Sequence, residues 1–65
     1  MFVNKNLKFL RNRQGWTQKQ LAEKLGLKQS VIGAYEEERA TPPLTCLLEV
    51  SEIFKVSLDT LTRKD

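Results

Sequence analysis

Apolar side chains recur three and four positions apart along most of the chain, the spacing of one face of an α-helix. This spacing predicts a first helix from about Asn4 to Gln14, with Leu7 and Leu10 facing inward. Gly15 follows it, at a position where helices commonly end. No segment alternates apolar and polar residues as a half-buried strand does. The pattern therefore predicts an all-α fold.

A second helix is predicted to begin at Thr17 and to end at Gly26. Thr17 can cap the amide of Gln20 while the Gln20 side chain reaches back to Thr17, which makes a capping box. Trp16 and Leu21 have the spacing of a hydrophobic staple across this cap. An aromatic residue beside basic ones is also typical of base stacking in single-strand binders, but the staple position favours packing.

A third helix follows almost at once, with Leu27 and Ile32 at staple spacing around Lys28. Such a short connection forces a sharp crossing of the two helices, which is the helix-turn-helix geometry, here at about residues 17–37. Pro43 opens a fourth helix and Ser57 caps a fifth. Together they predict a compact five-helix domain over residues 1–65. The inward positions predicted for the last two helices are Leu44, Leu47, Leu48, Val50, Phe54, Leu58 and Leu61.

Two very small residues stand in the middle of the third helix. With Ile32 inward and about 100° per residue, Gly33 and Ala34 point away from the core, although a mid-helix glycine costs ~1 kcal/mol. We expect them to be small because another surface approaches this helix closely, and the major groove of DNA, ~12 Å wide, admits one helix. The alternative is that Gly33 relieves crowding inside the protein.

Composition narrows the class of protein. The 65 residues suffice for one small domain, with Cys46 as a lone thiol, no histidine and no metal-loop spacing. We expect Cys46 to be an apolar filler in a reducing, cytoplasmic setting. No apolar run approaches the ~20 residues that span a membrane. With no paired carboxylates and no phosphate-binding glycine loop, we expect neither an enzyme nor a cofactor or metal.

Charge is distributed unevenly along the chain. Residues 1–35 carry seven basic side chains against Glu23 alone, whereas residues 36–65 carry four basic and seven acidic ones. This asymmetry indicates a surface that faces a polyanion, although a solvated lysine-rich face is an equal alternative on charge alone.

The run TQKQLAEKLGLKQSVIGAYE closely resembles the helix-turn-helix of the lambdoid phage repressor and Cro family, the XRE type of bacterial transcription regulators. Leu7, Leu10 and Arg11 before it, and P-x-L-x-x-L-L and V-S-L-D after it, extend the resemblance over nearly the whole chain. It implies a lambda-repressor-like DNA-binding domain, with the third helix in the major groove and the second across the backbone.

The resemblance also implies roles for individual residues. Glutamine suits adenine, lysine suits guanine and alanine can touch a thymine methyl. The alternative for Gln29 and Ser30 is exposed polar surface, and the alternative for Gln18 is a plain first-turn helix former. The implied base-reading positions are Lys28, Gln29, Ser30, Gly33 and Ala34, and the phosphate-contacting ones are Gln18, Lys19 and Arg39. Arg11 and Glu36 are implied to form an internal ion pair, and Ser57, Leu58 and Thr60 a dimer contact.

The chain departs from the family pattern at the start of the third helix and directly after it. Lys28 stands where a serine or threonine cap is usual, and lysine cannot cap the helix amides. After the third helix, Glu37 and Glu38 occupy a place where phosphate is contacted, with Glu38 at a position common for a left-handed glycine, and Arg39 partly compensates for their charge.

The sequence thus predicts sequence-specific binding of double-stranded DNA by a transcriptional repressor or regulator, a cytoplasmic homodimer on a two-fold operator. The alternative is an antitoxin or another protein-interaction module whose main partner is a protein. The acidic second half of the chain favours that alternative, and Phe9 and Ile53 are candidates for a protein-contact surface.

Overall fold

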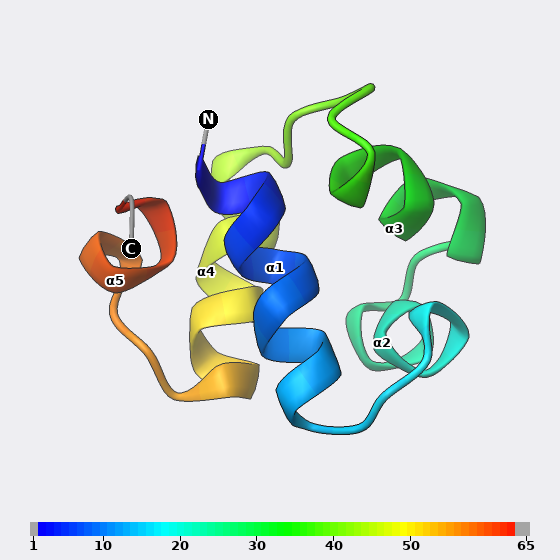
Figure 1. Ribbon diagram of the computed structural model, residues 1–65, viewed down its shortest axis with the longest axis horizontal. Coiled ribbons are helices and arrows are strands. Elements are labelled where there is room, and N and C mark those ends of the chain that lie inside the picture. Colours follow the sequence, from blue (N-terminus) through cyan, green and yellow to red (C-terminus); the bar gives the residue numbers. More distant parts are fainter. Residues whose placement is uncertain (1, 64–65) are drawn as a thin grey trace.

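The computed structural model describes residues 2–63, in which there are five helices and no strand. The helices are α1 (Phe2–Arg13), α2 (Gln18–Leu25), α3 (Gln29–Glu36), α4 (Leu44–Phe54) and α5 (Leu58–Thr62). α1 lies in the centre, with α2 and α3 on one side of it and α5 on the other (Figure 1). The predicted all-α, five-helix fold is confirmed, with α1 beginning at Phe2 instead of Asn4.

The core draws on every helix. Because none of these short helices would be stable in water alone, their packing on one another holds the fold together. The half-buried Trp16 packs on Phe54, with ring centroids 5.5 Å apart, so the packing role predicted for Trp16 is confirmed. The buried apolar residues are Val3, Leu7, Leu21, Ala22, Leu25, Ile32, Tyr35, Cys46, Val50, Phe54 and Leu61.

The helix ends follow the local sequence closely. The Thr17 Oγ1 accepts from the Gln20 amide at 3.0 Å and the Gln20 Oε1 accepts from the Thr17 amide at 2.7 Å, which confirms the capping box. Gly26 ends α2 with a φ of 67°, a conformation open to glycine at little cost. Ser57 accepts from the Thr60 amide at 3.0 Å and so caps α5 as predicted.

The inward face predicted for α4 is partly wrong. Leu44 and Leu48 are 64% and 44% exposed, whereas Cys46, Val50 and Phe54 are buried. These three residues recur every four positions and form one stripe along the helix. The stripe was hard to recognise in the sequence because leucines stand on both sides of it. Pro43 is the N-cap with a ψ of 164°, so the helix begins one residue after the predicted start.

Two asparagines of α1 join segments that are distant in sequence. The buried Asn4 donates through its Nδ2 to the carbonyl oxygens of Tyr35 and Ala40. Asn6 donates to the carbonyl oxygen of Leu61 at 2.7 Å and so ties α5 to α1. α1 thereby holds both the end of α3 and the end of α5. Within residues 2–63, no helix combines the length and apolar character needed to cross a membrane.

Candidate nucleic-acid interface

An internal network centred on Glu36 holds α3 against the rest of the domain. The Arg11 Nε and Nη2 donate to the two Glu36 carboxylate oxygens at 2.6 and 3.0 Å, the bidentate geometry of a strong ion pair. The two side chains are only 11% and 2% exposed. Gln18 Nε2 donates to the same carboxylate at 3.1 Å, and Arg11 Nη1 donates to the Trp16 carbonyl at 2.6 Å. Residues of α1, α2 and α3 therefore meet at one carboxylate.

The opposite side of α3 presents a polar end. Lys28, Gln29 and Ser30 are exposed at its start, and Ala34 is half-buried one turn further along. Ile32 and Tyr35 are buried on the other side and anchor the helix to the core. Lys28 is the N-cap and its side chain makes no capping hydrogen bond, as its chemistry predicted. The first-turn amides of α3 consequently lack a side-chain acceptor at this cap.

Gly33 does not lie on this open face, and the prediction that it faces outward is wrong. It is buried, and a Cβ added there would meet the Gln18 Oε1 at 3.6 Å and the Arg39 Nη2 at 4.0 Å. The helical wheel placed Gly33 correctly relative to Ile32, but it contained no information about α2, whose first residue covers this flank. The burial of Gly33 beside Gln18 and Arg39 argues against its predicted base-reading role.

The three residues assigned to phosphate contact differ in their surroundings. Lys19 is exposed and Gln18 is half-buried over Gly33, with its amide engaged by Glu36. Arg39 is 61% exposed and its Nε donates to Glu37 Oε1 at 3.0 Å. Only Lys19 thus presents a charge without an ion-pair partner among the described residues.

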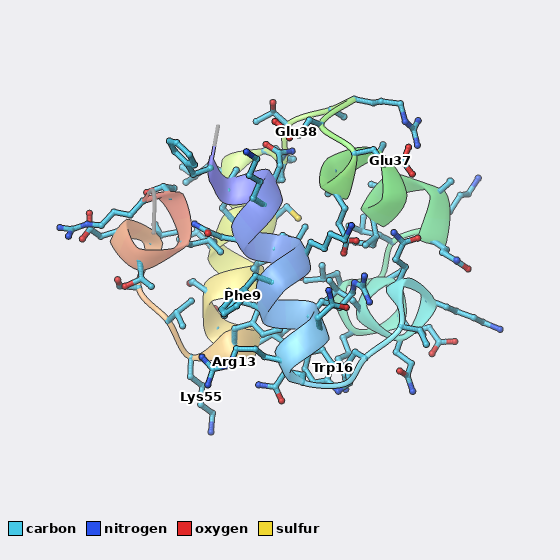
Figure 2. All side chains as sticks on the ribbon, viewed as in Figure 1. Phe9, Arg13, Trp16, Glu37, Glu38 and Lys55 are labelled. Atoms are coloured by element: carbon cyan, nitrogen blue, oxygen red, sulfur yellow. The ribbon has the colours of Figure 1, made fainter. Side chains whose placement is uncertain are left out.

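The turn after α3 is acidic and conformationally strained. Figure 2 shows Glu37 and Glu38 where the chain leaves α3. Glu38 has a φ of 62°, the left-handed region predicted from its position, in which a non-glycine residue costs about 1 kcal/mol or more. The Glu37 side chain is 63% exposed and neutralises Arg39.

The residues assigned to a dimer contact lie around the start of α5. Ser57 and Thr60 are exposed and Leu58 is half-buried, but the Ser57 hydroxyl is already bonded to the Thr60 amide and hydroxyl. α5 lies across α1 from α3 (Figure 1). The predicted dimer contact and the predicted DNA contact are therefore on different sides of the domain.

α2 and α3 are two short helices that cross sharply after a short turn. α3 buries one side in the core and exposes a polar side, and this arrangement defines a helix-turn-helix domain. Residues 7–61 match the family model described as helix-turn-helix. The chain belongs to this family, in its XRE type.

Several proteins of known name are similar to the chain. The HTH-type transcriptional regulator ImmR of Bacillus subtilis is 38% identical over all 65 residues, which cover 51% of ImmR. Antitoxin HipB of Escherichia coli K12 is 33% identical over 52 residues, which are 80% of this chain and 59% of HipB. The chain spans about half the length of the curated relatives it matches.

Two solved structures share the fold. The N-terminal DNA binding domain of SinR from Bacillus subtilis superposes with a TM-score of 0.86 and 29% identity, over 98% of this chain and 94% of that one. A transcriptional regulator from Listeria innocua superposes with a TM-score of 0.87 over 97% of this chain and 61% of that one. At 23% identity, the second likeness shows the fold alone.

Proposed function

We propose that this domain binds double-stranded DNA sequence-specifically and serves as a repressor or regulator of transcription, with α3 in the major groove. The observation that carries the proposal is the asymmetry of α3, which is anchored by Ile32, Tyr35 and Glu36 and exposes Gln29 and Ser30 at its opposite edge. Similarity to ImmR and to the DNA binding domain of SinR supports it.

The proposed contacts with base edges are made by residues at the start of α3. Gln29 offers the paired donor and acceptor that match adenine, Ser30 suits either partner of a base edge, and Lys28 suits guanine. Ala34 lies one turn along, where its methyl can meet a thymine methyl. Lys28 also brings a positive charge to the uncapped amides of this helix, a combination that attracts phosphate.

The proposed contacts with phosphate are made by the start of α2 and by Arg39. The Gln18 and Lys19 amides open α2 and have no acceptor within the helix, and the exposed Lys19 ammonium stands beside them. Arg39 donates its Nε to Glu37, and this carboxylate offsets the attraction of Arg39 for phosphate, so its contribution is expected to be smaller than that of Lys19.

One short recognition helix reads few base pairs, so we propose that two copies bind a two-fold operator with half-sites ~34–36 Å apart. Ser57, Leu58 and Thr60 remain the proposed dimer contact, at the start of α5. Sedimentation at saturating operator tests the assembly, and one protomer per operator would refute it.

The direct experiment is selection of bound duplexes from a random pool, followed by titration of the selected duplex and of a scrambled one at several salt concentrations. Binding should be tighter for the selected duplex and should weaken with salt, because the protein displaces counterions from phosphate. Equal affinity for both duplexes would remove the claim of specificity.

The likeness to the antitoxin HipB supports a second candidate, a module whose main partner is a protein. The acidic turn at Glu37 and Glu38 favours it, since like charge repels phosphate. Failure of the chain to bind any duplex at low salt, where electrostatic attraction is strongest, would favour this candidate over the first.

A further inference from the structure

A shallow groove lies on the side of the domain away from α3, between α1 and the segment that leads into α5. Its lining residues are Asn6, Phe9, Leu10, Arg13, Val56 and Thr60, and its volume is about 160 Å³. Pockets for cofactors and drug-sized ligands usually measure roughly 300–1,000 Å³, so this groove fits one side chain of a docked partner better than a separate small molecule.

The groove combines an apolar floor with a basic rim. Phe9 is 52% exposed, which is unusual for a phenylalanine, and the Arg13 guanidinium lies 5.8 Å from its ring centroid. Lys55 directly precedes the groove residue Val56, and in Figure 2 it projects from the same end of the molecule as Arg13. Neither Arg13 nor Lys55 forms an ion pair within residues 2–63. Nearby Asp59 is neutralised by Arg63 at 2.7 Å.

The backbone adds an independent indication at Lys55. Its φ is 57°, a left-handed conformation that favours glycine over any residue with a side chain. Lys55 is the C-cap of α4, where glycine would be more favourable than lysine. The lysine side chain adds a second positive charge next to the groove residue Val56.

We propose that this groove binds an acidic, amphipathic peptide segment of a partner protein. An apolar side chain of the partner occupies the groove against Phe9 and Val56, and its carboxylates pair with Arg13 and Lys55. Because α3 lies on the other side of α1, such a partner leaves the DNA-facing helix open (Figure 1). It shares Thr60 with the proposed dimer contact, so the acidic segment and a second copy of the chain compete for this side of the domain.

The probe is a fluorescein-labelled helical peptide of about 15 residues, long enough to hold a helix, with leucine and phenylalanine on one face and glutamates beside them. A matched peptide carries lysine in place of each glutamate. The acidic peptide should bind, with chemical-shift changes at Phe9, Val56 and Thr60, and the basic peptide should not. Equal binding of the two peptides, or shift changes confined to α3, would overturn the proposal.

Four variants sharpen the test. Phe9→Ser and Arg13→Glu alter exposed side chains, and each should weaken binding of the acidic peptide by about tenfold or more. Phe9→Ser removes the apolar contact, and Arg13→Glu replaces attraction of the peptide carboxylates by repulsion. Lys55→Gly should raise thermal stability yet weaken peptide binding, a pair of effects that a purely structural role for Lys55 would not give. Lys24→Glu, the same change of charge on α2, should leave binding at the parental level.

Parental affinity in both Phe9→Ser and Arg13→Glu would refute the groove as the binding site. If Arg13→Glu instead weakens duplex binding while the acidic peptide fails to bind the parent, the rim cations serve DNA and the proposal falls. Neither outcome depends on whether α3 reads a specific operator.

Discussion

The carboxylate of Glu36, at the end of α3, receives both a bidentate pair from Arg11 and the side-chain amide of Gln18. With all of its described buried polar side-chain atoms bonded, the domain leaves no unsatisfied group at this junction. Satisfied buried networks of this kind specify one arrangement of the elements that they join. The network therefore holds α3 in one orientation relative to α1 and α2.

Arg11→Met should lower the free energy of unfolding by about 3–5 kcal/mol, because it leaves the Glu36 carboxylate buried without its cation. The measurement is urea denaturation. Arg39→Met is the matched control, since the pair of Arg39 with Glu37 is exposed and should contribute at most ~1 kcal/mol. Equal stability losses in the two variants would show that burial adds nothing to the Arg11 pair.

Gly33→Ala should raise the free energy of unfolding by up to ~1 kcal/mol, the difference in helix propensity. The added methyl meets only the ends of the Gln18 and Arg39 side chains, at ordinary contact distances. For a domain of this size the gain corresponds to a melting temperature higher by about 4–8 °C, measurable by circular dichroism. Gly26→Ala is the control and should destabilise, because φ at Gly26 is 67°. A loss of stability in Gly33→Ala would show that the Gln18 side chain cannot move to make room for the added methyl group.

Ala34→Glu should fold normally and lose duplex binding, because a longer, charged side chain would hold α3 off the major groove. Gln29→Ala should fold equally well and lose about 1–3 kcal/mol of discrimination at one base pair. Affinities for the selected duplex and its single-base variants measure both effects. A folded Ala34→Glu variant with parental affinity would remove α3 from the groove.

The domain should lose stability in alkaline solution. Burial, and secondarily the charge of Glu49, raises the pKa of the Cys46 thiol, and burial followed by Cys46 raises the pKa of the Tyr35 hydroxyl. Both groups are therefore harder to deprotonate in the folded state than in the unfolded state. Their contribution is fully present below the ordinary pKa values of 9.0 and 10.0 and is lost as pH rises past them.

Urea denaturation at a series of pH values above neutral checks this expectation, with Cys46→Ala as the comparison. The variant lacks one of the two titrating groups, so its stability should fall less steeply with pH than that of the parent. Parallel slopes would show that the Cys46 thiol plays no part in the alkaline loss.

Features that depend on nearest neighbours along the chain could be predicted from the amino-acid sequence alone. Thr17 with Gln20, Gly26 and Ser57 set helix ends through local hydrogen bonds and backbone preference, and the structure has them where the sequence predicts. The buried positions Leu7, Ile32 and Leu61 follow from helical periodicity in the same way. The exposed, polar start of α3 also follows from sequence, because no large apolar residue interrupts it.

Features that depend on which element covers each helix face could be seen only in the folded structure. Gly33 appeared open on the wheel and is buried under Gln18, since only packing brings the start of α2 across α3. Leu48 appeared buried and is exposed, because periodicity describes a stripe without saying which stripe meets the core. Phe9 and Arg13 lie one turn apart on α1 but far in sequence from Val56 and Thr60, and only the packing of α1 beside the turn into α5 brings the two pairs to one groove.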